Sequence, residues 1–209
     1  IWQDVLKTTG GYKLQAEHQT AAINRCLDEL EPVLDLFPEN FLYKGVAKRV
    51  RISIVRSVDD KIQGVHFWDG SDPYIILSVG ADVRDSVTKA MGYIVDSHVL
   101  GNSSIVDLWA NLNPTDFAYG TQNAYEEYLT GADMAFLDQQ SMQSVVEDRS
   151  RVFYYAMKDN CAQLFQSKTM QAKLLQLCKG IRNAWRLERK ADVYPWEQYL
   201  HQSLAYTGE

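Results

Sequence analysis

The hydrophobic positions along the chain predict an amphipathic helix followed by three short strands. In residues 16–37 apolar side chains recur every three or four positions, which places them on one face of a helix. The side chains concerned are those of Ile23, Leu27, Leu30 and Leu34. Residues 48–55 instead alternate apolar with basic or polar side chains, as a half-buried strand does. Two further apolar runs, 64–68 and 74–79, flank the turn-rich segment 69–73 and predict a hairpin.

The remainder of the chain has mainly helical periodicity. A central helix is predicted over residues 83–99, with Asp82 as its N-cap. Its apolar side chains Val87, Met91 and Ile94 recur at helical spacing. The same spacing predicts four further helices, at residues 103–112, 145–158, 161–165 and 169–189.

Strands and helices both occur, and no repeat, low-complexity tract or linker separates them. We therefore expect an α+β fold in a single domain that covers residues 1–209. Residues 1–15 are expected to be a loosely held arm. Residues 116–130 carry four aromatic side chains, and they form either a lid held down by aromatic packing or the wall of a cleft.

Composition places the chain among globular proteins, with 46% hydrophobic and 23% charged residues. No apolar run approaches the roughly 18–20 residues that a membrane-spanning helix needs. An odd number of cysteines gives no closed disulfide framework. All three are therefore expected to be free and buried: Cys26, Cys161 and Cys178.

The charge is distributed unevenly along the chain, although the net charge of −6 gives no nucleic-acid signature. No Lys or Arg lies between Lys89 and Arg149, whereas nine Asp and Glu residues do. Residues 168–190 hold seven basic residues and one acid. We expect this basic helix to face acidic residues of the 107–148 region of the same chain rather than a nucleic acid.

Three positions on the central helix have the spacing of a metallopeptidase motif. Lys89 and Tyr93 are four residues apart, and Ala90 follows Lys89. In the zinc-peptidase motif H-E-x-x-H, two histidine ligands have this spacing, and the glutamate after the first histidine is the general base. Here the same frame reads K-A-M-G-Y.

Segments beyond this frame carry a resemblance to a known family, whose pattern runs H-E-x-G-H-x-x-D, then W-x-x-L-N-P-x-x-F-x-Y, then E-D-R-A-x-x-F-x-Y-A-M. The matching positions are Gly92, Asp96, the W-A-N-L-N-P run at 109–114 with Phe117 and Tyr119, and the E-D-R-S-R-V-F-Y-Y-A-M run at 147–157. From about residue 17 to residue 196, the chain resembles a group of bacterial secreted, lipoprotein-type zinc metallopeptidases. These are similar to the gluzincins and to the catalytic domain of lethal-factor-like toxins.

The resemblance implies a zincin-like fold, in which a small mixed sheet of three or four strands packs on the motif helix and further helices. It implies that residues 74–79 form the sheet edge beside a substrate groove, and that Glu147 stands at the position of the third zinc ligand. The supporting positions are Asp96, Asp148, Arg151 and Tyr154, and the groove positions are Tyr74, Ile76, Tyr119, Tyr125 and Tyr128. The resemblance also implies export, so an extracellular or cell-surface location is expected, with any membrane anchor upstream of Ile1.

The side chains in the motif frame cannot perform the chemistry of this family. Lys89 and Tyr93 replace the two histidines, and a protonated lysine has no lone pair to offer Zn²⁺. Ala90 cannot accept a proton, so the general base is missing as well. We therefore expect neither zinc nor another cofactor. Lys89 is expected instead to pair with Glu147 where the ion would be, while Tyr93 donates to the same carboxylate.

Because the motif frame lacks the family's zinc ligands and general base, we expect a function without catalysis. The chain is expected to be an inactive relative of these peptidases, a binding or scaffold module that holds a peptide or a cell-surface ligand in the former substrate groove. Two alternatives stay open, an active metal-dependent hydrolase with a rearranged site and a purely structural surface protein. His66 and His98 are expected to be structural residues, because His66 lies on a strand and His98 lies off-phase from Lys89 on the helix.

Overall fold

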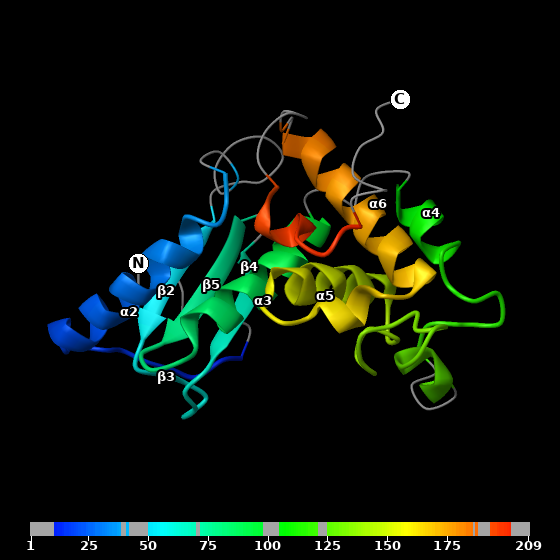
Figure 1. Ribbon diagram of the computed structural model, residues 1–209. Coiled ribbons are helices and arrows are strands. Elements are labelled where there is room, and N and C mark those ends of the chain that lie inside the picture. Colours follow the sequence, from blue (N-terminus) through cyan, green and yellow to red (C-terminus); the bar gives the residue numbers. More distant parts are fainter. Residues whose placement is uncertain are drawn as a thin grey trace. The chain divides into compact units, whose positions relative to one another are not determined.

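The computed structural model has the α+β fold that the sequence predicts (Figure 1). It describes residues 11–38, 41, 50–69, 72–97, 105–120, 125–185, 187 and 193–201. Within these residues there are five α-helices and two small sheets, one of two strands and one of three. The contacts within the chain divide it into two compact units, unit 1 (residues 1–90) and unit 2 (residues 91–209).

The first helix of unit 1 is amphipathic, as predicted. α2 (Thr20–Leu34) buries one stripe of side chains, which consists of Ala22, Cys26, Leu30 and Val33. This stripe differs from the predicted one, because Leu27 is 46% exposed. The stripe instead includes the small side chains of Ala22 and Cys26, which were not among the residues that defined the predicted face.

Three strands of unit 1 form a mixed sheet. They are β2 (Arg51–Val55), β4 (Gly64–Asp69) and β5 (Asp72–Ser78), in the order β2-β5-β4. β2 runs parallel to β5, and β4 runs antiparallel to it. A second sheet pairs β1 (Leu14–Gln15) with β3 (Ser57–Val58), so the last two residues of the predicted arm are paired within unit 1.

The position of β5 corrects one expectation from the family resemblance. Residues 74–79 were expected at a sheet edge, but β5 is the central strand and is hydrogen-bonded on both sides. Tyr74 and Ile76 are 7% and 0% exposed, so neither lines an open groove. The reason is visible in the sequence of β5, because its consecutive apolar residues suit a strand that is covered on both faces. The edges of this sheet are β2 and β4.

α3 (Val83–Val95) begins where the sequence predicts. The backbone nitrogen of Asp85 donates to Asp82 Oδ1 at 2.8 Å, which is the bond of an N-cap. The predicted apolar face is buried, namely Val87, Met91 and Ile94. The boundary between the two units falls inside this helix, after Ala90.

Unit 2 is built from helices and short 3₁₀ turns. Its elements after α3 are α4 (Ile105–Ala110), η2 (Glu126–Leu129), α5 (Val145–Met157), η3 (Ala162–Phe165), α6 (Lys168–Trp185) and η4 (Pro195–Glu197). α5 and α6 pack against each other, and η4 packs on both (Figure 1). The buried side chains of these three elements include Phe153, Met157, Leu174, Ile181 and Trp196.

The cysteines behave as predicted, since all three are free and buried. The pKa of the Cys178 thiol lies well above its ordinary value, chiefly because burial disfavours the thiolate. The residue therefore serves as a small apolar side chain rather than as a nucleophile. In the part of the chain that the structure describes, no helix has both the length and the apolar character needed to cross a membrane.

Candidate functional site

The end of α3 and the helix α5 approach each other closely in unit 2, and the approach requires a glycine. A Cβ placed on Gly92 would lie 2.6 Å from the backbone oxygen of Ser150. Because the obstacle is backbone rather than a flexible side chain, a larger residue would push the helices apart. Gly92 therefore sets the spacing that lets the side chains beside it reach α5.

Tyr93 and Glu147 meet across this contact. The Tyr93 hydroxyl lies 2.9 Å from Glu147 Oε1 and 2.8 Å from Oε2, so a single O–H donor is shared by the whole carboxylate. Glu147 is itself positioned by the start of α5, because its backbone nitrogen donates to the N-cap oxygen of Ser144 at 3.1 Å. The sequence predicts this contact between residues that are 54 positions apart.

The environment keeps the Tyr93 hydroxyl protonated. Its pKa is raised well above the ordinary value, first because burial disfavours the phenolate and then because the Glu147 carboxylate accepts its hydrogen bond. A neutral phenol is a donor to a carboxylate, and it is a poor ligand for a metal ion. This pair is therefore a hydrogen-bonded link between α3 and α5.

Arg151 lies one turn after Glu147 on α5 and supplies positive charge near it. Its Nε is 4.0 Å from Glu147 Oε2, and its Nη1 is 3.4 Å from Asp138 Oδ2. Its Nη2 donates to Gln140 Oε1, and the guanidinium lies 5.9 Å from the ring centre of Tyr154. Of the predicted supporting residues, Arg151 thus lies beside Glu147, and Tyr154 lies beside Arg151.

Asp96 and Arg149 form a second link between the end of α3 and α5. The Arg149 Nε donates to Asp96 Oδ1, and the two side chains are 3% and 5% exposed. Burial raises the pKa of Asp96, and the hydrogen bond and charge of Arg149 oppose that rise. A buried carboxylate needs such a partner, because an isolated charge in the interior is costly. The predicted supporting role of Asp96 therefore takes the form of an ion pair.

Asp148 forms hydrogen bonds to the W-A-N-L-N-P segment and to the tyrosine that follows it. Its Oδ2 accepts hydrogen bonds from Trp109 Nε1 at 2.9 Å and from the Tyr119 hydroxyl at 2.7 Å. Asn113 Nδ2 in turn donates to the Tyr119 oxygen at 2.9 Å. Lys173 Nζ on α6 completes the cluster at 2.6 Å from the same Asp148 oxygen. Residues 147 and 149 therefore both bind the end of α3, and residue 148 between them binds the segment that contains Trp109 and Tyr119.

Lys173 is a member of this cluster that the sequence reasoning missed. The basic helix was expected to present its charges to acids at the surface, yet the Lys173 side chain is wholly buried and also donates to the Ala135 carbonyl at 2.7 Å. Burial lowers its pKa, while Asp148 acts in the opposite direction. The signal was available in the phase of α6, because residue 173 lies in register with the buried positions 170 and 177.

A second basic residue of α6 is also paired with an acid of the same chain. Arg182 pairs with Glu197 of η4, with Nη2 2.5 Å from Oε2, and both side chains are buried. Two charges of the basic helix are thus satisfied within unit 2, one of them by Asp148 in the predicted acidic region. That this basic helix does not bind nucleic acid stays a prediction.

Residues 116–130 hold the aromatic groove candidates of unit 2. Tyr125 and Tyr128 pack with Phe117 against the buried residues Ala135 and Phe136. The Tyr125 hydroxyl donates a hydrogen bond to the Asp116 carbonyl, and the Tyr128 hydroxyl donates one to the Asp116 carboxylate. Tyr119 belongs to the Asp148 cluster, where burial raises the pKa of its phenol.

Lys89 lies just before the boundary between the two units, so its expected pairing with Glu147 of unit 2 stays a prediction. It lies in unit 1 and is exposed, and Ala90 beside it is buried. Its charge acts on His66 of β4, whose pKa it helps to lower. Within unit 2, Glu147 has Tyr93 as its hydrogen-bond donor and Arg151 as the nearby cation. His98 lies outside the described residues.

The motif positions do not fit a zinc ion. Lys89 and Tyr93 offer an ammonium and a protonated phenol, and Glu147 is already engaged. Among the described residues, no group of three His, Cys, Asp or Glu side chains has an arrangement that could hold a metal ion. Comparison with protein-family models, with curated proteins and with solved structures returns no match for this chain.

Proposed function

We propose that the chain is a zincin-like protein in which a hydrogen-bonded link stands where the metal would be, and that it acts as a non-catalytic binding or scaffold module. The observation that carries the proposal is the contact between the Tyr93 hydroxyl and both oxygens of Glu147. These are the second and third ligand positions that the family pattern assigns. Two atoms that bind one zinc ion at about 2 Å each lie within ~4 Å of each other, which is the proximity these side chains have.

The remaining parts of the pattern support the same proposal. Gly92 is required by the close helix contact, Asp96 pairs with Arg149, and Trp109 donates to Asp148. Each contact joins two segments that the pattern contains, although they are far apart in the chain. A pattern matched by accident gives no reason for its separate pieces to bind one another.

The proposed role excludes peptide hydrolysis for a chemical reason. Attack on an amide needs an activated water, and in this family a zinc ion with a glutamate base activates it. Ala90 provides no base, and the Tyr93–Glu147 pair provides no metal site. What such a fold retains is a surface for a peptide or cell-surface ligand. The resemblance places that role outside the cell, and we propose that location with it.

The test is metal content together with reconstruction of the motif. Protein purified without chelator is expected to hold no stoichiometric zinc, and to show no chelator-sensitive cleavage of casein. The triple variant Lys89→His, Ala90→Glu, Tyr93→His is expected to gain zinc binding, because it restores the family's donors around Glu147. The matched control adds Glu147→Gln to the triple variant and is expected to lose that zinc.

Two outcomes would contradict the proposal. Stoichiometric zinc in the unmodified protein would favour the alternative of an active hydrolase with a rearranged site. Failure of the folded triple variant to bind zinc would remove the zincin relationship, and a purely structural role would then be the simpler reading.

A further inference from the structure

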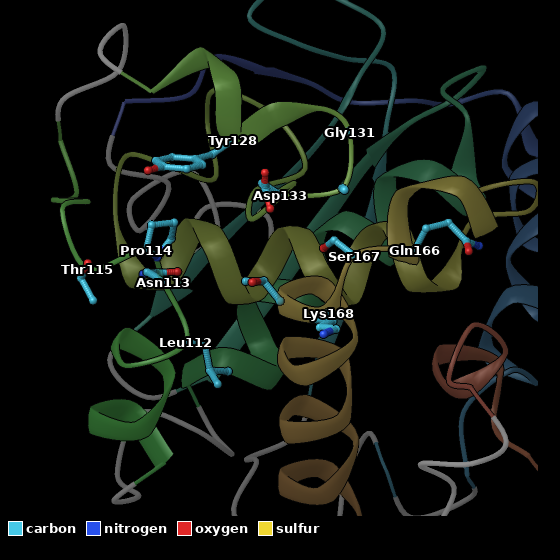
Figure 2. Close-up of a pocket in the computed structure, with 12 residues that line it drawn as sticks. Leu112, Asn113, Pro114, Thr115, Tyr128, Gly131, Asp133, Gln166, Ser167 and Lys168 are labelled. Carbon is cyan, nitrogen blue, oxygen red and sulfur yellow. The ribbon is translucent and has the colours of Figure 1, made fainter.

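A pocket of about 900 Å³ lies within unit 2, lined by the segments 112–115, 128–133 and 166–169 (Figure 2). These are the residues after α4, the segment that begins in η2 and continues past it, and the start of α6. The volume is in the range of pockets that accept small molecules. The pocket shares no residue with the Tyr93–Glu147 link, so its role does not depend on the function proposed above.

The Tyr128 ring forms one wall of this pocket and is held firmly. Its hydroxyl donates to the Asp116 carboxylate, with distances of 3.0 and 3.2 Å to the two oxygens. Its carbonyl accepts from the backbone nitrogens of Ala135 at 2.8 Å and Phe136 at 3.1 Å. The ring also stacks with Tyr125, at 6.0 Å between centroids. A ring fixed at both ends is a ready surface for C–H groups of a ligand, at little entropic cost.

The polar side chains on the other walls are mostly uncharged. They are Asn113, Thr115, Gln166, Ser167 and Thr169. One acid and one base, Asp133 and Lys168, add charges that cancel formally. Asn113, Gln166 and Ser167 already form hydrogen bonds within the chain. The hydroxyls of Thr115 and Thr169 both donate and accept, so this lining matches a neutral ligand whose rim carries hydroxyl groups. Figure 2 shows Asp133 and Tyr128 on one side of the pocket and Lys168 on another.

At the start of α6 the chain itself satisfies one of the N–H groups that an anion would use, that of Met170. Ser167 Oγ accepts from the backbone nitrogen of Met170 at 3.0 Å, and the Ser167 carbonyl accepts from that of Gln171 at 3.0 Å. The Asp133 carboxylate on the facing segment would also repel an anion. A phosphate or carboxylate ligand is therefore disfavoured relative to a neutral one.

We propose that this pocket binds a neutral saccharide of one or two pyranose rings. A pyranose has an apolar face of C–H groups and a rim of hydroxyls, which is the combination the pocket complements. In this arrangement the C–H face lies on Tyr128, and the exposed side chains of Asp133 and Thr115 bond the hydroxyls.

The experiment titrates the full chain with cellobiose, maltose, lactose and N,N′-diacetylchitobiose, read by saturation-transfer NMR and by calorimetry. At least one disaccharide is expected to bind, with Kd of the order of 1 mM or tighter. Tyr128→Ala is expected to weaken that binding at least ~10-fold, since it removes the stacking surface. Tyr128→Phe keeps the ring and is expected to stay within about threefold of wild type.

Two further variants keep the test independent of folding. Asp133→Asn changes an exposed side chain and is expected to weaken binding several-fold, of the order of the loss of one charge-assisted hydrogen bond. Glu127→Ala removes an exposed acid next to Tyr128 that does not line the pocket, and it is expected to leave affinity unchanged. The proposal is overturned if none of the four disaccharides binds, or if Tyr128→Ala and Asp133→Asn both bind as wild type does. It is equally overturned if inorganic phosphate binds in a Lys168-dependent manner and the sugars do not.

Discussion

Lys173 of α6 and Asp148 of α5 are both wholly buried, and the lysine nitrogen lies 2.6 Å from one carboxylate oxygen. The same oxygen accepts from Trp109 and Tyr119, so one side-chain atom ties together four segments of unit 2. The Lys173 ammonium also lies 4.0 Å from the ring centre of Phe136. Burying such an ion pair costs desolvation free energy. Removing only one partner destabilises the fold more than removing both, because the other partner is left buried without a counter-ion.

Loss of the lysine alone is therefore expected to be severe. Lys173→Met should lower the free energy of unfolding by ~3–5 kcal/mol, because it leaves the buried Asp148 side chain without its cationic partner. The double variant Lys173→Met, Asp148→Asn should recover much of that loss, since the neutral amide can still accept from Trp109 and Tyr119. Urea unfolding followed by circular dichroism measures both. Lys179→Met, at an exposed position of the same helix, is the control and should change stability by less than about 0.5 kcal/mol.

Gly92→Ala tests the close contact between α3 and α5. In an ordinary helix interior this change is stabilising by up to ~1 kcal/mol. Here the added Cβ would meet the Ser150 carbonyl oxygen at 2.6 Å, so a loss of ~1–3 kcal/mol is expected. Thermal and urea unfolding give the sign directly, and a Gly92→Ala variant more stable than the wild type would refute the steric role.

The Tyr93–Glu147 hydrogen bond is open to a double-mutant cycle. Tyr93→Phe and Glu147→Gln should each destabilise unit 2, and the coupling free energy should be ~1–3 kcal/mol, as for a hydrogen bond to a charged group. Tyr155→Phe offers a matched control, because its hydroxyl lies at the longer distance of 3.3 Å from Asp138 Oδ2 and should matter less. A coupling energy near zero would mean that the contact contributes nothing to the link between the helices.

Periodicity predicted the elements well, because it reports which faces of a segment meet the core. The buried face of α3 and the three strands follow from it, while the Asp82 cap follows from an acidic residue at the helix start. The contact of Tyr93 with Glu147 was also predicted, but through the family pattern, which encodes a tertiary relation that periodicity does not contain.

The errors have physical reasons of the same kind. The resemblance placed residues 74–79 at a sheet edge, whereas their consecutive apolar side chains suit a strand that is covered on both faces. Lys173 was judged by its charge when its phase on α6 was the better guide.

The pH dependence of unit 1 is expected to depend on His66. This residue lies half-buried on β4, and its pKa is lowered to about 4, first by burial and then by the positive charge of Lys89. The unfolded chain has an ordinary imidazole, which takes up a proton below pH ~6.5. Between these two values the unfolded state binds more protons, so stability is full above pH ~6.5 and falls as the pH drops towards 4.

His66→Gln isolates this contribution, because the amide does not titrate. From pH 7.5 to pH 5, the stability of the variant is expected to improve relative to wild type by ~2 kcal/mol. Lys89→Met should act in the same direction but more weakly, since it removes only the second cause of the lowered pKa. Urea unfolding at matched ionic strength gives these differences, and direct NMR titration of the His66 ring gives its pKa. An imidazole that titrates near 6.5 in the folded protein, with a stability difference that does not change with pH, would show that His66 is protonated without cost to the fold.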